Sequence, residues 1–205
     1  MTSDNSSANC STVSETAPVV LAVDLDAAEP STPAPASETA AVTVRTEHLD
    51  GRQRRIIAQL EIPHPIEQVW EILTDYDHLA DFIPNLAQSR RIEHPDGGIR
   101  LEQIGSESVL KIKVYLRVVL DMVERFPHEL QFTMIEGDFR TFTGAWELEP
   151  IAAGAGTYLR YVVTVLPPRA IPVGLIERNL RHNLANNLLA IRERANALFG
   201  AIAQS

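Results

Sequence analysis

The sequence predicts an α+β fold in which a curved antiparallel sheet of about seven strands wraps around one long C-terminal helix. Apolar residues recur every three or four positions between Pro172 and Ala203, which is helical spacing. This apolar stripe consists of Ile176, Leu180, Leu184, Leu188, Ile191, Ala195, Leu198 and Ile202. Between residues 86 and 166 the apolar period is two, as in strands covered on one face only. Because a long amphipathic helix is not stable alone, it needs an apolar surface of matching length, and the strands supply one.

Residues 1–44 form a segment of different composition, rich in Ser, Thr, Ala and Pro, with six acidic residues and no Lys or Arg. Such a segment cannot bury enough apolar surface to offset its ordering entropy. We therefore expect a disordered acidic tail over 1–44 and one folded domain over 45–205. The apolar patch at 19–23 is too short and lacks the basic flank of a signal peptide, while a docking-peptide role is left open.

The overall charge and the single cysteine narrow the class of protein. A net charge of −9 argues against general nucleic-acid binding. No apolar run approaches the roughly 20 residues that span a bilayer. Cys10 is the sole cysteine, so no intrachain disulfide or thiolate metal cluster can form, which fits a reducing compartment. We expect a cytoplasmic protein and leave open a transient contact with a membrane surface.

The elements before the long helix follow from local patterns. Arg54–Ile62 alternates as a first strand and is stopped by two prolines. Two short helices follow, one over Ile66–Leu73 and one around Leu79 to Ile83 that ends at Pro84. Turn residues then separate six expected strands at Ala87–His94, Ile99–Ser106, Val109–Phe126, Glu129–Glu136, Arg140–Glu149 and Thr157–Leu166.

This element order predicts a cavity between the sheet and the helix. A strongly curved sheet cannot contact a straight helix along its whole length, and the two short helices would close one end. Pro172 suits the first turn of the long helix, where its missing N–H would have no partner in any case.

Three stretches carry a resemblance to a known family: VWEILTDYDHLADFIPNL at 69–86, EGDFRTFTGAWELEP at 136–150 and AIRERANALFG at 190–200. They resemble the polyketide cyclase and coenzyme Q-binding protein group of the START-like (SRPBCC) superfamily, over about residues 54–200. The resemblance implies a helix-grip fold and a pocket for a hydrophobic molecule such as a prenyl quinone, lipid or polyketide. It also includes a bacterial branch described as ribosome-association toxins. The acidic tail has no counterpart in short members of the group.

Ten residues are candidates for ligand binding because they fall on the inner faces of the expected elements. The candidates near the short helices could form a hydrophobic gate at the cavity mouth, or they could be ordinary core residues. The candidates on the sheet and the long helix could line a ligand pocket, or their side chains could fill that space. The tryptophan among them needs a partner for its N–H if it is buried. The candidates are Tyr76, Phe82, Ile83, Leu116, Val118, Phe142, Trp146, Tyr161, Leu180 and Leu184.

The polar residues show no catalytic or metal-binding pattern. An acid–base pair could come from among Asp75, Asp77, Asp138 and Arg140. Alternatively, Asp138 and Arg140 could stabilise a hairpin, and Asp75 or Asp77 could cap a helix. No histidine pair has metal-helix spacing, and we expect four histidines at turn-like positions to be solvated. These are His64, His78, His94 and His128.

We therefore expect a non-enzymatic carrier or chaperone for a hydrophobic small molecule, with no cofactor other than a bound quinone or lipid. A pocket of roughly 300 Å³ or more with few polar groups would support this function. A polyketide cyclase or dehydratase is the alternative, and it requires an inner polar group from among Glu102, Gln103, Tyr158 and Tyr161. Ribosome association is a third hypothesis, in which the negative charge favours contact with a ribosomal protein over RNA.

Overall fold

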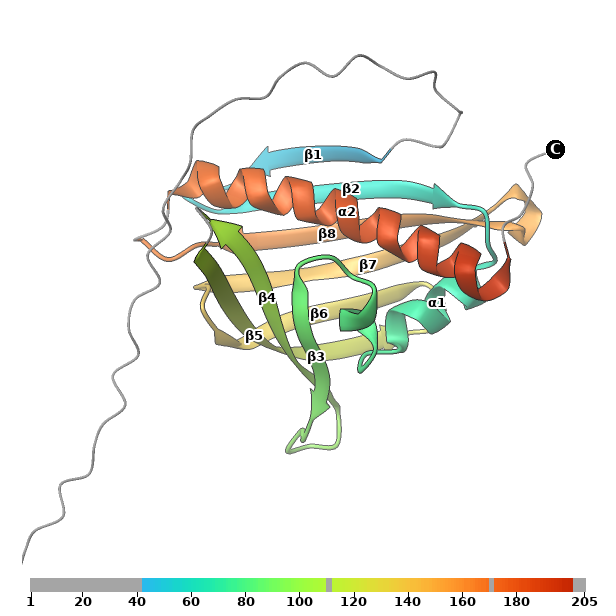
Figure 1. Ribbon diagram of the computed structural model, residues 1–205, viewed down its shortest axis with the longest axis horizontal. Coiled ribbons are helices and arrows are strands. Elements are labelled where there is room, and N and C mark those ends of the chain that lie inside the picture. Colours follow the sequence, from blue (N-terminus) through green and yellow to red (C-terminus); the bar gives the residue numbers. More distant parts are fainter. Residues whose placement is uncertain (1–41, 110–111, 170–171, 201–205) are drawn as a thin grey trace, which may run out of the picture.

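The computed structural model describes residues 42–109, 112–169 and 172–200. Eight strands form one antiparallel sheet in the order β1-β2-β8-β7-β6-β5-β4-β3, and α2 lies along one of its faces (Figure 1). This is the predicted helix-grip arrangement with one more strand than expected. The elements are β1 (Thr43–His48), β2 (Arg54–Ile62), α1 (Ile66–Thr74), the 3₁₀ turn η1 (Leu79–Asp81), β3 (Leu86–Ile92), β4 (Ile99–Val109), β5 (Ile112–Arg125), β6 (Glu129–Gly137), β7 (Thr141–Ile151), the 3₁₀ turn η2 (Ala152–Gly154), β8 (Gly156–Leu166) and α2 (Val173–Phe199).

The additional strand is β1, which the sequence pattern did not reveal. Its residues TVRTEH contain one large apolar side chain, Val44, so no period-two signal marks the strand. Backbone pairing with β2 and packing against α2 hold it in place. The prediction of a tail over residues 1–44 is therefore wrong for Thr43 and Val44, which belong to the sheet. Residues 1–41 lie outside the described residues, and the disorder of that part stays a prediction.

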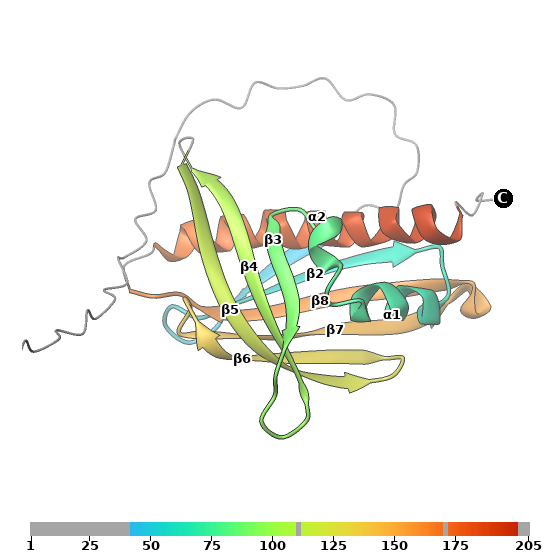
Figure 2. The same cartoon turned by 60° about the horizontal axis from the view of Figure 1, so that its bottom comes forward.

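The sheet bends away from α2 on the side of β3, β4 and β5. Figure 2 shows these strands turned steeply against β7 and β8. Register irregularities occur in β3 at Ala87, between Leu86 and Gln88, and in β6 at Ile135, opposite Val119 and Leu120 of β5; such bulges increase local twist. Gly137 ends β6 with a φ of 153°, where a Cβ would lie 2.6 Å from the Arg117 carbonyl oxygen. The chain therefore needs glycine at this bend.

The helix α2 packs on the other half of the sheet, against β1, β2 and β8, and against α1. The predicted apolar stripe is confirmed from Ile176 to Ala195, where its residues are buried or partly buried. The prediction is wrong for Leu198, which is 51% exposed, and Phe199, four residues after Ala195, packs on the core in its place. Ile202 lies outside the described residues. No helix in the described part of the chain has the length and apolarity needed to cross a bilayer.

A buried histidine connects the C-terminal end of α2 to the rest of the core. We expected His64 to be solvated, but it is only 1% exposed. Its Nδ1 lies 3.1 Å from Gln68 Oε1 and its Nε2 lies 2.9 Å from Asn196 Oδ1, while its carbonyl oxygen accepts a hydrogen bond from Thr157 Oγ1. One residue thus joins the start of α1 to α2 and β8. Tertiary contact overrides the usual exposure of a turn residue here, because both ring nitrogens find partners.

Gly144 in β7 permits close packing on the inner face of the sheet. A Cβ at this position would lie 2.0 Å from the Val162 carbonyl oxygen and 2.5 Å from the nearest ring carbon of Phe132. Neither atom can move away easily. The Val162 oxygen belongs to the backbone of β8, and Phe132 is only 4% exposed.

We predict that Gly144→Ala lowers the free energy of unfolding by about 1–3 kcal/mol, because the added methyl overpacks this face. Urea unfolding followed by circular dichroism measures the change. Gly174→Ala is the matched control: its Cβ would meet no atom within 4 Å, and alanine suits the first turn of α2. The control should be neutral or slightly stabilising. Equal losses in both variants would contradict the packing role of Gly144.

Candidate ligand cavity

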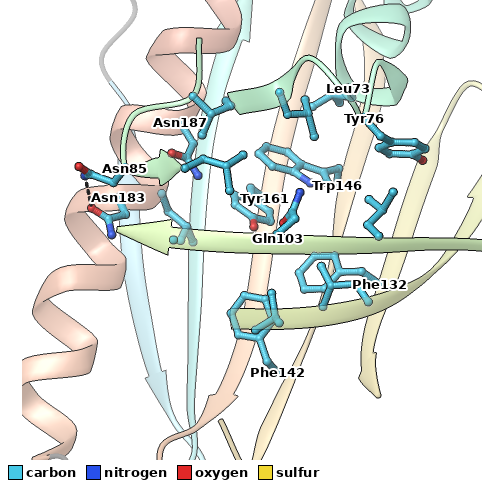
Figure 3. Close-up of a pocket in the computed structure, with 18 of the residues that line it drawn as sticks. Leu73, Tyr76, Asn85, Gln103, Phe132, Phe142, Trp146, Tyr161, Asn183 and Asn187 are labelled. Atoms are coloured by element: carbon cyan, nitrogen blue, oxygen red, sulfur yellow. Dashed lines mark hydrogen bonds between the residues drawn. The ribbon is translucent and has the colours of Figure 1, made fainter. Parts of the chain in front are cut away.

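A cavity of about 210 Å³ lies where the curved half of the sheet separates from α2 (Figure 3). It is enclosed by α1, the segment around η1, β3 to β8 and the middle of α2. Pro84 and Asn85 are exposed at its edge, so the cavity opens to solvent there. Its lining residues are Leu73, Tyr76, Leu79, Ile83, Pro84, Asn85, Leu86, Leu101, Gln103, Gly105, Ser106, Leu116, Val118, Leu120, Met122, Leu130, Phe132, Phe139, Phe142, Trp146, Tyr161, Leu180, Asn183, Leu184, Asn187 and Ile191.

Aromatic rings form the wall on the sheet side. Trp146 of β7 and Tyr161 of β8 are register partners, and their rings stack at 3.5 Å with an interplanar angle of 8°. Phe142 lies 5.3 Å from Phe139 and 5.5 Å from Phe132, measured between ring centroids. Alternation along β7 and β8 places these rings on one face of the sheet. The result is a broad apolar surface suited to a planar ring.

The polar groups in the lining are neutral, and they come from the segment after η1, from β4 and from α2. Gln103 donates from Nε2 to Ser89 Oγ at 3.2 Å, and Asn85 donates from Nδ2 to Asn183 Oδ1 at 3.3 Å. The Oδ1 atom of Asn187 is buried without a hydrogen-bond partner among the described residues. The lining contains no Asp, Glu, Lys, Arg or His from the described parts of the chain.

Two tyrosines are the titratable residues of the lining. Burial raises the pKa of Tyr76, and the hydrogen bond that its hydroxyl donates to Glu124 Oε1 at 2.7 Å raises it further. Burial also raises the pKa of Tyr161. Both hydroxyls therefore stay protonated at neutral pH, so neither serves as a base there.

Nine of the ten predicted ligand-binding residues line this cavity. Their role in binding stays a prediction, but their convergence on one space is a property of the fold. Phe82 is the exception and lies outside the lining. Its ring sits under the Arg194 guanidinium at 5.4 Å and packs on the core, so it does not gate the cavity.

The polar candidates divide between the two faces of the sheet. Gln103 and Tyr161 reach the cavity, as the cyclase hypothesis required of at least one of them. Glu102 and Tyr158 do not reach the cavity. Glu102 lies between the lining residues Leu101 and Gln103, and Tyr158 precedes the core residue Leu159. Because successive side chains of a strand point to opposite faces, both face the outer side of the sheet. Glu102 instead accepts hydrogen bonds from Arg117 Nε and Arg90 Nε, both at 2.7 Å.

The aspartates form local contacts outside the cavity. Asp75 pairs with His78, at 2.6 Å between Oδ1 and Nδ1. Asp77 Oδ1 and Asp138 Oδ2 accept hydrogen bonds from the backbone N–H groups of Arg91 and Arg117, respectively. These contacts agree with structural rather than acid–base roles. Within the described residues, no group of three or more His, Cys, Asp or Glu side chains is arranged to hold a metal ion.

Sequence reasoning missed the amides of α2 and several apolar residues. Asn183 and Asn187 are not among the predicted ligand-binding residues, although they follow the lining residues Leu180 and Leu184 by three positions each on α2. A cavity next to the buried stripe admits such residues, and amphipathic periodicity alone cannot separate them from solvated ones. Phe132 was also missed, although Leu130, Phe132 and Met134 alternate with polar residues along β6.

The cavity is smaller than the roughly 300 Å³ that we expected of a carrier. Its volume of about 210 Å³ suits a ring system or a ligand headgroup. A longer chain on the ligand would have to leave through the opening at Pro84 and Asn85.

A second depression, of about 400 Å³, lies on the outer face of the sheet. Its walls are mostly charged and polar, and its charged side chains already have ion-pair partners within or beside the depression. Arg160 pairs with Glu147, and Arg55 bonds Thr164 and Glu47. We therefore place the candidate site in the inner cavity.

Comparison with known proteins gives a family match over residues 62–189, more than half of the chain. The matched family is described as polyketide cyclase / dehydrase and lipid transport. A comparison with curated proteins gives no match.

Solved structures share the fold. The STAR-related lipid transfer protein of Xanthomonas axonopodis is 16% identical, with a TM-score of 0.61, over 80% of this chain and 97% of that one. The Zhui aromatase/cyclase of Streptomyces sp. R1128 is 15% identical, with a TM-score of 0.60, over 73% and 99%. A Thermus thermophilus protein is 20% identical, with a TM-score of 0.60, over 70% and 97%. At these identities the likeness is one of fold.

The outward position of Glu102 generates a pH prediction. Hydrogen bonds from Arg117 and Arg90 hold the pKa of Glu102 below its ordinary value of 4.5. A depressed folded-state pKa stabilises the fold above the unfolded pKa, and this contribution disappears as the pH falls through the folded pKa. Glu102→Gln should therefore cost about 1 kcal/mol of stability at pH 7. The deficit should shrink below about pH 4.5 in urea unfolding series.

Glu136→Gln is the control, because Glu136 shares the Arg117 contact but its side chain is 67% exposed. An exposed ion pair contributes little, so the loss at pH 7 should be smaller. A deficit for Glu102→Gln that is constant from pH 7 to pH 3 would contradict the assignment.

Proposed function

Because the chain belongs to the polyketide cyclase / dehydrase and lipid transport family, we propose that it binds and carries a neutral hydrophobic small molecule, a prenyl quinone or lipid-like compound, in the cavity beside α2. The observation that carries the proposal is the lining itself. It is apolar and aromatic over most of its surface, has a few amide and hydroxyl groups, and contains no charged residue from the described parts of the chain. Sites that bind small molecules are lined mainly by apolar and aromatic side chains, with a few polar groups that orient the ligand.

The same lining favours a carrier over a cyclase. Cyclisation or dehydration needs proton transfer, which is assigned to groups whose pKa lies near the operating pH. Of the polar candidates, only Gln103 and Tyr161 reach the cavity, and burial moves the Tyr161 pKa away from neutrality. An amide and a protonated phenol can orient a carbonyl group, but neither serves as a base at pH 7.

The driving force would come from stacking a ring on Trp146 and Tyr161. An aromatic group buries about 150–250 Å². At about 25 cal/mol per Å² this burial gives roughly 4–6 kcal/mol before the entropy cost of association is subtracted. Even before that cost is subtracted, this gain corresponds to a Kd of only about 1 mM to 40 μM. A small ring compound should therefore bind weakly, and a substituent that extends from the opening should strengthen binding.

A carrier of a sparingly water-soluble ligand must take up and release that ligand at a surface or partner that also holds it. We propose a cytoplasmic protein that makes transient contact with a membrane surface. The opening at Pro84 and Asn85 is where the ligand would enter.

Tryptophan fluorescence tests the proposal because the chain has two tryptophans and only one of them lines the cavity. Trp70 sits in α1 against Phe126, with ring centroids 5.3 Å apart. In the Trp70→Phe variant, Trp146 is the sole tryptophan. Titration with a ubiquinone that carries one prenyl unit should quench its emission in a saturable way, because quinones accept excitation from a stacked indole.

The Trp146→Phe variant, in which only Trp70 emits, is the matched control and should show no saturable quenching. Quenching that is equal in the two variants, or linear in quinone concentration in both, would contradict binding in the cavity.

A further inference from the structure

Four amide side chains belong to the cavity lining, and we call them the amide wall: Asn85, Gln103, Asn183 and Asn187. Asn85 follows η1, Gln103 comes from β4, and the other two come from consecutive turns of α2. Figure 3 shows Gln103 and Asn187 reaching from their separate elements toward the space lined by Trp146 and Tyr161. All four groups are uncharged at every pH at which the protein folds.

Two of these amides retain unused hydrogen-bonding capacity. Gln103 makes one side-chain hydrogen bond within the described residues, from Nε2 to Ser89, which leaves its Oε1 and one N–H group. Asn187 makes none within the same residues, and its Oδ1 is buried. A buried amide without a partner costs about 1–3 kcal/mol, and a ligand oxygen that met it would offset this cost. Asn85 and Asn183 bond each other at 3.3 Å and serve as the fixed part of the wall.

The surrounding lining restricts the charge of that ligand group. A carboxylate or phosphate brought into the cavity would lose water and meet no Lys, Arg or His from the described lining. Burying an unpaired charge costs far more than burying a hydrogen-bonded carbonyl or hydroxyl group. The hydroxyl of Tyr161, which makes no hydrogen bond within the described residues, offers another donor to an uncharged oxygen.

We infer that Gln103 and Asn187 form a hydrogen-bonding subsite for a carbonyl or hydroxyl oxygen on a neutral ring compound, and that the cavity rejects the carboxylate analogue of the same ring. This inference rests on the proposed function and narrows it. The ring stacks on Trp146 and Tyr161, its oxygen faces the amide wall, and any apolar chain leaves at Pro84. The subsite thereby sets the class of ligand, whereas the aromatic wall supplies the general affinity.

Compounds of one ring size test the inference: naphthalene, 1,4-naphthoquinone, 1-naphthol and 2-naphthoate at pH 7, measured by isothermal titration calorimetry. The full chain should bind the quinone or the naphthol about tenfold more tightly than naphthalene, since one net hydrogen bond is worth about this factor. It should bind 2-naphthoate at least tenfold more weakly than the better of the two neutral oxygen compounds.

Asn187→Leu and Gln103→Leu should each remove most of the advantage of the oxygen compounds and leave naphthalene affinity within about threefold. Asn186→Leu is the control, because Asn186 is the next residue of α2, bonds His182 and does not line the cavity. It should leave all four affinities unchanged.

The outcomes separate the subsite from the proposed function. If the wild-type chain binds naphthalene and both oxygen compounds equally, or binds 2-naphthoate most tightly, the subsite is overturned while binding in the cavity stands. An advantage of the oxygen compounds that survives in both leucine variants also overturns it. If none of the neutral compounds binds, both the proposed function and the subsite are contradicted.

Discussion

The structure depends on the one-sided packing of α2. The helix buries its apolar stripe against β1, β2 and β8, and the buried His64 joins its C-terminal end to the start of α1. The strands β3 to β5 bend away from that packed half, so the helix and the sheet diverge along their length (Figure 2). The cavity is the space left by this divergence. Its volume is therefore set by the curvature of the sheet, which bulges and a positive-φ glycine maintain.

The chemistry of the cavity follows from which residues face the diverging space. Strand alternation brings Phe132, Phe142, Trp146 and Tyr161 to the sheet side, and charged residues such as Glu102 and Arg117 fall on the outer face, where they pair with one another. The middle of α2 contributes leucines and two asparagines. A neutral, aromatic and sparsely polar interior results. This interior supports binding of an uncharged hydrophobic molecule more readily than it supports acid–base catalysis.

Most of the fold could be predicted from periodicity. The long helix, the alternation in β5 and β7, and the prolines after β2 each specify an element, and the order of elements then restricts the architecture. Nine cavity residues could be predicted for the same reason, since inward-facing positions on a curved sheet must converge. Strand β1 could not, because backbone pairing rather than apolar alternation holds it. His64 and Asn187 could not either, because their burial depends on partners more than 100 residues away or on a cavity that local sequence does not encode.

The central claim is that the cavity holds a neutral apolar molecule, and organic extraction of the purified full-length chain followed by mass spectrometry tests it most directly. Gly105→Leu is the comparison, because Gly105 lines the cavity and a Cβ there would make only ordinary contacts, at 3.7 and 3.8 Å. A Cβ is thus accommodated at this position, and the rest of the leucine side chain would take up cavity volume. We expect the wild-type chain to release an uncharged compound with carbonyl or hydroxyl oxygens, and the variant to release none. The same compound in equal amount from both proteins, or a charged phospholipid from the wild type, would contradict it.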